Sequence, residues 1–131
     1  DIPYCLFDGP CIVRGIGEKI EEVSFDLKEE IMIVNPNIYI STKDVFLNNK
    51  KISNKENIDL INYFEYLEND LEEAAFCVSK ELKQVKEYLL SLNLKKVVMS
   101  GSGSTFILLV DKDKKEDIYN IIKKETNYLV F

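Results

Sequence analysis

The stretch from Lys95 to Val110, "KKVVMSGSGSTFILLV", constrains the fold more than any other part of the sequence. Five consecutive Gly or Ser residues, from Ser100 to Ser104, separate two short apolar runs. Short apolar, β-branched runs around glycines predict two neighbouring β-strands joined by a tight turn. Alternatively, glycines with positive φ let such a loop lie against a phosphate group. The local pattern leaves both interpretations open.

A Walker-type phosphate loop is excluded by the residues that follow the glycines. Such a loop needs a lysine and a following helix, because both bring positive potential to the phosphates. Here Thr105 and Phe106 begin another strand pattern, and no lysine precedes them in the loop. The residues themselves support a turn between strands, with a small nest of backbone N–H groups as the alternative.

The segments around this hairpin predict an α+β domain. "EIMIVNP" at 30–36 is typical of a buried strand, and "NYLVF" at 127–131 of another. Between the hairpin and the last strand, a helix is predicted with one apolar face formed by Ile118, Ile121 and Ile122. With helices in the central third, the order becomes β-α-β-β-α-β. We therefore expect a ferredoxin-like (split βαβ) fold, an antiparallel sheet with helices on one face.

Two capping boxes mark helix starts in the central third. Ser41 with Asp44 predicts a short helix through "DVFLNN", and Ser53 with Glu56 predicts a second start.

Two apolar repeats follow these starts, one over 60–71 and one from about Asn69 to Leu92. Their apolar residues are Leu60, Phe64, Leu67 and Leu71, then Ala75, Val78, Leu82, Val85 and Leu89. Asn69 is interpreted as a helix cap. Lys83, Lys86 and Glu87 are expected on a solvated face.

Charge and cysteine usage exclude several classes of protein. With 17 Lys and Arg interleaved among 23 Asp and Glu, the net charge is −6, which leaves no basic face for nucleic acid. Cys5, Cys11 and Cys77 lack CxxC spacing and the sequence has no histidine, so no metal site is predicted. We expect reduced, mostly buried thiols in a cytoplasmic protein. No apolar run is long enough to span a membrane.

Three pieces of sequence resemble the C-terminal half of the GHMP kinases, named for galactokinase, homoserine kinase, mevalonate kinase and phosphomevalonate kinase. They are "DIPYCLFDGPCIVRGIGEKI", "NDLEEAAF" and "VVMSGSGSTFILL", in the family's order. The resemblance covers nearly the whole chain. It points to the branch that phosphorylates the 2-hydroxyl of 4-diphosphocytidyl-2-C-methyl-D-erythritol in non-mevalonate isoprenoid precursor synthesis. It implies ATP and Mg²⁺ as cofactors and a cytidyl diphosphate as substrate.

The resemblance also implies roles for single residues. Asp1 matches the base that accepts the proton of the substrate hydroxyl, a role that suits a carboxylate. Thr42 and Phe46 match a segment that lines the cytidine pocket, where an aromatic ring can stack on the base. A glycine-rich loop that supports the nucleotide phosphate loop is matched by Gly101, Ser102, Gly103 and Ser104.

Plainer interpretations exist for the first three of these residues. Asp1 is otherwise a solvated terminus, Thr42 the first residue of a helix, and Phe46 a core residue. The segment from Asn69 to Glu72 also matches the family, but we favour its interpretation as a helix cap.

The resemblance divides the chain into two parts. Residues 1–29 are expected to be a β-rich remnant of the N-terminal kinase domain, and 30–131 the ferredoxin-like C-terminal domain. Because the sequence opens at Asp1 without Met, we expect it to come from a longer protein. Strands without their partner sheet expose apolar faces, so we also expect self-association through 2–13.

The family's P-x-G-x-G-L-G-G-S-S-like ATP loop does not occur in this sequence. We therefore expect the parent protein to be an ATP phosphotransferase acting on an alcohol, and this chain alone to have no kinase activity. Two alternatives stay open: a non-catalytic ferredoxin-like module that binds a small ligand, and the same half of a mevalonate or homoserine kinase.

Overall fold

A four-stranded antiparallel sheet forms the centre of the computed structural model, which describes residues 2–51 and 63–131. Its strands are β3 (Glu30–Asn35), β4 (Lys96–Met99), β5 (Phe106–Val110) and β6 (Leu129–Val130). They lie in the order β4-β5-β3-β6, and every neighbouring pair is antiparallel. Helices connect β3 to β4 and β5 to β6. The predicted ferredoxin-like fold is therefore confirmed.

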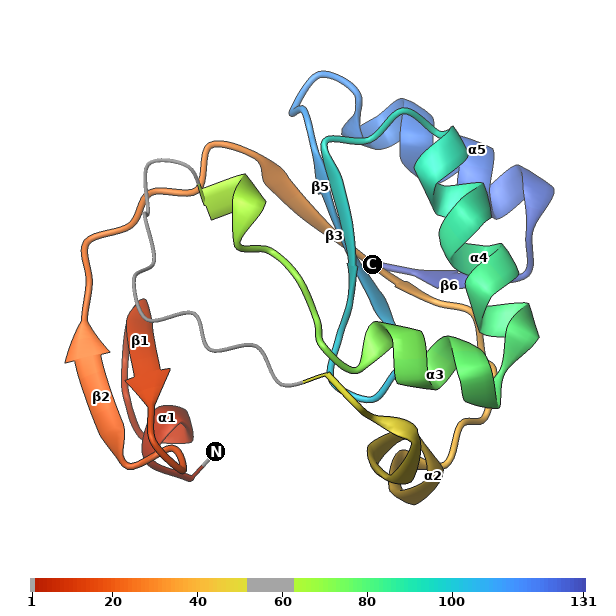
Figure 1. Cartoon of the computed structure of the whole chain (residues 1–131). Helices are drawn as coiled ribbons and strands as arrows, with labels where there is room; N and C mark the ends of the chain where they lie inside the picture. Colours follow the sequence, from red (N-terminus) through yellow and green to blue (C-terminus); the bar gives the residue numbers. More distant parts are fainter. Residues whose placement is uncertain (1, 52–62) are drawn as a thin grey trace.

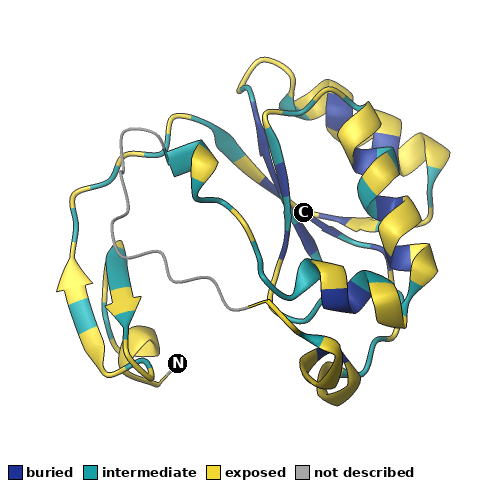
Figure 2. Cartoon of the chain, in the orientation of Figure 1, coloured by how far each residue is buried: buried dark blue, intermediate teal, exposed yellow. Residues whose placement is uncertain are grey.

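One face of this sheet carries the core, because side chains alternate between the two faces of a strand. Met32 pairs with Leu108 and Val34 with Phe106, and all four side chains are at most 1% exposed. Figure 1 shows α3 (Glu72–Val78), α4 (Lys80–Ser91) and α5 (Lys115–Glu125) on the same side of the sheet. Their buried residues are Ala74, Ala75, Leu82, Val85, Leu89, Ile118 and Ile122 (Figure 2). Burying one large aliphatic side chain contributes roughly 1.5–3 kcal/mol.

The short helix α2 (Thr42–Asn48) begins where the first capping box predicts. The Ser41 side chain accepts a hydrogen bond from the Asp44 N–H at 3.3 Å, which satisfies one of the donors left without a partner at a helix start. This prediction is confirmed.

The central helices differ from the predicted pair. In the described part of the repeat over 60–71, the structure has only the single 3₁₀ turn η1 (Tyr63–Glu65) before the chain extends, so one continuous helix there is wrong. Ser53, Glu56 and Leu60 lie outside the described residues. The second helix is divided at Ser79, whose backbone is extended (φ −135°, ψ 107°) and whose hydroxyl caps α4 by accepting from Leu82 N–H. Such a capping serine ends one helix and starts another.

The N-terminal segment forms its own small hairpin. Strands β1 (Cys11–Arg14) and β2 (Lys19–Glu22) pair with each other and with no other described strand. Part of this segment is helical: Tyr4 and Cys5 lie in the helical turn α1 (Ile2–Cys5), since a short apolar run alone does not distinguish a helix from a strand. In Figure 1 this hairpin stands on the opposite side of the sheet from α4 and α5. No residue from 2 to 29 is buried (Figure 2). A domain boundary at residue 29 stays a prediction.

The cysteines are free thiols, but their expected burial is wrong. Cys5 and Cys77 are exposed and Cys11 is half-buried, because α1 and β1 lie outside the core and Cys77 lies on the outer side of α3. Among the described residues, no group of three or more His, Cys, Asp or Glu side chains is arranged to hold a metal ion. Within 2–51 and 63–131, no helix has the length and hydropathy that a membrane span requires.

Candidate functional site: the loop between β4 and β5

The loop from Ser100 to Thr105 is a tight turn between two antiparallel strands. The Ser100 N–H donates to the Thr105 carbonyl at 2.8 Å, and the Gly103 N–H donates to the Ser100 carbonyl at 3.0 Å. Gly101 has φ 55° and Gly103 has φ 93°, a region that favours glycine. The predicted turn is confirmed. We refer to 100–105 as the Gly-Ser loop.

The two glycines of this loop have different surroundings. A Cβ atom on Gly103 would lie 3.0 Å from Met99 Sδ and 3.3 Å from Leu82 Cδ2, so Gly103 allows the loop to pack closely against the core. A Cβ atom on Gly101 would have no heavy atom within 4 Å. Only Gly101 therefore offers room for another molecule to approach the loop backbone.

Asn69 connects the start of α3 to the Gly-Ser loop. Its side-chain Nδ2 donates to the Met99 and Gly101 carbonyl oxygens, both at 2.7 Å. Its Oδ1 accepts from the Leu71 N–H at 3.0 Å. The predicted cap is only partly right, because the N-cap residue of α3 is Leu71 and the Asn69 amide group is engaged mainly by the loop.

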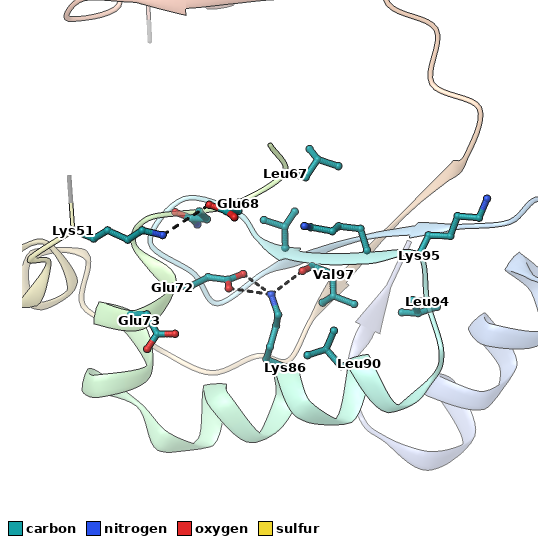
Figure 3. A pocket seen from close by; sticks show the side chains of 13 residues that line it. Lys51, Leu67, Glu68, Glu72, Glu73, Lys86, Leu90, Leu94, Lys95 and Val97 are labelled. Atoms are coloured by element: carbon teal, nitrogen blue, oxygen red, sulfur yellow. Dashed lines mark hydrogen bonds and ion pairs between the residues drawn. The ribbon is translucent and has the colours of Figure 1, made fainter. Parts of the chain in front are cut away.

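Glu72 and Lys86 continue this connection along β4. Glu72 Oε1 accepts from the Met99 N–H at 2.7 Å, and Lys86 Nζ lies 2.7 Å from the same oxygen (Figure 3). Lys86 Nζ also donates to the Val97 carbonyl at 2.7 Å. The two charged side chains are only 15% and 18% exposed. The expected solvated position of Lys86 is therefore wrong, because this part of α4 faces the edge of β4.

These side chains occupy an edge that would otherwise be open. β4 is the last strand of its sheet, and the outward N–H and C=O groups of an edge strand are a template for pairing with other chains. In this structure the Met99 N–H, the Met99 carbonyl and the Val97 carbonyl are bound by Glu72, Asn69 and Lys86. Three outward backbone groups at this end of β4 are thus bound by Asn69, by Glu72 of α3 and by Lys86 of α4.

Two further contacts bring the Gly-Ser loop to β3 and α2. The Thr42 and Ser102 hydroxyl oxygens lie 2.9 Å apart, and Asn35 Nδ2 donates to Thr105 Oγ1 at 3.1 Å. Thr42, the first residue of α2, and Ser102 were both predicted as site residues, and the structure brings them together.

Three further predicted site residues, Ser104, Phe46 and Asp1, are not shown to take part in this contact. Ser104 is buried, at 9% exposed. Phe46 is 60% exposed and lies one turn beyond Thr42 in α2, so its interpretation as a core residue is wrong. Asp1 lies outside the described residues.

A groove of about 360 Å³ follows the edge of β4 and contains four lysines, Lys51, Lys86, Lys95 and Lys96 (Figure 3). Each of them is engaged within the chain. Lys51 pairs with Asp70 at 3.3 Å, Lys95 with Asp111 at 2.8 Å, and Lys96 Nζ donates to the Phe64 carbonyl at 2.8 Å. The Asp111 hydrogen bond raises the pKa of Lys95. Three of the four lysines are therefore paired with carboxylates, and Lys96 binds a carbonyl oxygen, so most of the positive charge in the groove is compensated within the described residues.

The comparison with protein families decides the classification of this domain. The sequence model described as "GHMP kinases C terminal" matches residues 48–128, more than half of the chain. The chain belongs to this family. The GHMP kinase C-terminal assignment covers α3 to α5 and includes the complete Gly-Ser loop.

Curated relatives of this GHMP kinase domain agree along nearly all of its length. A 4-diphosphocytidyl-2-C-methyl-D-erythritol kinase of Carboxydothermus hydrogenoformans is 36% identical over 91% of this chain and 46% of its own length. A protein of the same name from Bacillus cereus strain B4264 is 32% identical, over 94% of this chain and 47% of its own. The chain therefore spans about half the length of these relatives.

A crystal structure of a 4-(cytidine 5'-diphospho)-2C-methyl-D-erythritol kinase has the same fold as this GHMP kinase domain. It superposes with a TM-score of 0.69 and covers 92% of this chain and 48% of that one. At 24% identity, this likeness shows the fold alone.

Glu72 and Lys86 were not predicted as part of the site. The sequence signal was present in "NDLE", where Asn69 and Glu72 are three residues apart, but a helix cap explained it equally well. In the structure Asn69 binds Met99 and Gly101, and Glu72 binds Met99. These partners lie about 30 residues further along the chain, and no local pattern shows such a contact.

Proposed function

We propose that this chain is the C-terminal half of an ATP-dependent kinase that phosphorylates the 2-hydroxyl of 4-diphosphocytidyl-2-C-methyl-D-erythritol, a step of non-mevalonate isoprenoid precursor synthesis. The structural observation on which this proposal rests is the Gly-Ser loop. It has an open positive-φ glycine, Gly101, and side chains from two other segments hold it in place. The names of the relatives matched over 91–94% of the chain support the same activity.

In this proposal the chain supplies part of a site. Asp1 accepts the proton of the substrate hydroxyl, and Thr42 and Phe46 line the cytidine pocket. The Gly-Ser loop lies beside the phosphates of ATP. Its open backbone at Gly101 fits such a supporting role, together with the paired hydroxyls of Thr42 and Ser102. Bound Mg²⁺ would neutralise phosphate charge, and we assign its ligands to ATP and the preceding half. We place the reaction in the cytoplasm.

Two exposed apolar surfaces support the proposal that another part of the kinase packs against this chain. The N-terminal segment exposes Ile2 (77%), Leu6 (83%) and Ile16 (96%). The sheet face opposite the helices exposes Ile31 (49%) and Ile33 (40%). Scattered apolar residues are ordinary on a protein surface, but adjoining ones mark contact regions. In our proposal the preceding half of the kinase covers these surfaces, and the chain alone has no kinase activity.

A chimera tests this function. The matching C-terminal half of the Carboxydothermus hydrogenoformans relative is replaced by this chain, and ADP formation is measured with 4-diphosphocytidyl-2-C-methyl-D-erythritol. We expect substrate-dependent turnover by the chimera and none by this chain alone. Mevalonate and homoserine are the control substrates, since they test the other GHMP kinases. A chimera with native circular dichroism that turns over only a control substrate, or none of the three, would overturn the proposal.

A further inference from the structure

We infer that Asn69, Glu72 and Lys86 are positioning residues for the Gly-Ser loop: they fix the end of β4 and the peptide groups of the loop, and so set the direction of its N–H donors. This inference rests on the proposed function, in which those donors lie beside the phosphates of ATP. The three residues act through the backbone and are not catalytic residues themselves.

The Asn69 amide determines the orientation of two peptide groups. In a planar trans peptide, the C=O of one residue and the N–H of the next point in opposite directions. Asn69 holds the Met99 carbonyl on the outer side, and the Ser100 N–H accordingly points inward to the Thr105 carbonyl. Asn69 holds the Gly101 carbonyl in the same way, so the Ser102 N–H is directed away from Asn69.

The chemistry of these contacts requires an amide group at position 69. Its NH₂ group provides two donors to two carbonyl oxygens, and its oxygen accepts from the Leu71 N–H. An aspartate has the same shape but no donor at neutral pH. It would place a negative charge 2.7 Å from the Met99 and Gly101 oxygens.

Glu72 and Lys86 fix the strand from which the loop departs. Both Glu72 oxygens contact Lys86 Nζ, at 2.7 and 3.0 Å, and the Oε1 atom also accepts from the Met99 N–H. Lys86 reaches the Val97 carbonyl, two residues before Met99. Because charge-assisted hydrogen bonds are shorter and stronger than neutral ones, this group holds β4 firmly at its outer edge.

Hydrogen exchange on this chain gives the first test. We expect Asn69→Asp to speed exchange of the Ser100 and Gly103 amides at least tenfold, with the Leu108 amide in β5 unchanged. The matched control is Asn48→Asp, because the Asn48 amide donates to the Asp44 carbonyl within α2, a contact made away from the loop. Glu72→Gln, which keeps the side-chain size, replaces Asn69→Asp if that variant does not fold. Unchanged exchange at Ser100 and Gly103 would overturn the inference.

Kinetics of the chimera give the second test. We expect Asn69→Asp to lower kcat/KM for ATP at least tenfold while the KM for the alcohol substrate changes less than twofold. A smaller folded fraction would lower the apparent kcat and leave both KM values unchanged, so the positioning role also requires a raised KM for ATP. Lys86→Arg should retain activity and Lys86→Met should not. An unchanged kcat/KM for ATP would overturn the positioning role. If the unsubstituted chimera is inactive, the proposed function fails and the exchange result alone decides the inference.

Discussion

Lys86 Nζ lies 2.7 Å from Glu72 Oε1, and this ion pair joins α4 to the first turn of α3 at the edge of β4. Exposed ion pairs contribute little to stability, with measured values of about 0–1 kcal/mol. This pair is different because each partner is less than one fifth exposed and also binds a backbone group of β4. Removing one partner leaves the other partly buried without its counter-charge.

We therefore expect Lys86→Ala to lower the free energy of unfolding by about 1–3 kcal/mol. The control is Lys83→Ala on the same helix, where the lysine is exposed and the change should stay within about 0.5 kcal/mol. Urea denaturation of both variants measures the difference. Equal stabilities would show that the pair contributes no more than a surface contact.

The two glycines of the Gly-Ser loop give a second matched comparison. Both have positive φ, so alanine at either position costs about 1–2 kcal/mol from backbone strain alone. At Gly103 the new methyl group would also be too close to Met99 and Leu82. Overpacking of this kind adds roughly 1–3 kcal/mol. Gly103→Ala should therefore lower the denaturation midpoint clearly more than Gly101→Ala, and the reverse order would contradict the packing described here.

The break between α3 and α4 depends on Ser79. Its hydroxyl accepts from the Leu82 N–H at 3.3 Å, so Ser79→Ala should destabilise the chain by about 1 kcal/mol. Ser79→Asp keeps a capping oxygen and should stay close to the original stability. Thermal unfolding of the two variants checks this prediction. It fails if both substitutions change the melting temperature equally.

Acid should weaken the contact between η1 and the segment that leads into β3. The Tyr63 hydroxyl donates to Glu29, and this bond, with help from Lys95, holds the pKa of Glu29 below its ordinary value of 4.5. A lowered folded-state pKa stabilises the fold above about pH 4.5, and that stability is lost as the pH falls through the folded-state pKa. Glu29→Gln should therefore reduce the loss of melting temperature between pH 5 and pH 3. The control is Glu87→Gln on the exposed side of α4, which should leave the acid dependence as it is.

The exposed N-terminal segment leads to a prediction about assembly. Ile2, Leu6 and Ile16 are 77–96% exposed, so we expect the isolated chain to self-associate in sedimentation experiments as its concentration rises. Leu6→Ser with Ile16→Ser should reduce that association without changing the melting temperature, because neither residue belongs to the core. A chain that stays monomeric at high concentration would contradict the prediction.

The sequence predicted those parts of the fold that depend on local patterns. Short apolar runs indicated β3 to β6, and Ser41 with Asp44 indicated α2, because these signals arise within a few residues. The helix over 60–71 was wrong in its described part, since apolar spacing alone does not show that the chain extends after Glu65.

The candidate site was predictable only in its loop. Glycine and serine between two strands indicated the turn, but the side chains that hold it come from distant segments. Lys86 appeared to lie on the polar face of a helix, and only the tertiary structure shows that this face meets the edge of β4. Long-range contacts of this kind leave no periodic signal in one sequence.

The position of β3 in the sheet has a consequence for biosynthesis. β3 is the first strand of the sheet in the sequence, yet it lies between β5 and β6, which come from the last quarter of the chain. On the ribosome it therefore emerges long before either neighbour, while the local β4–β5 hairpin can form as soon as it is made. Both edges of β3 are unpaired until residues 106–110 have been released, and the second edge stays open until residues 129–130 follow, so the nascent chain is exposed to aggregation throughout this interval.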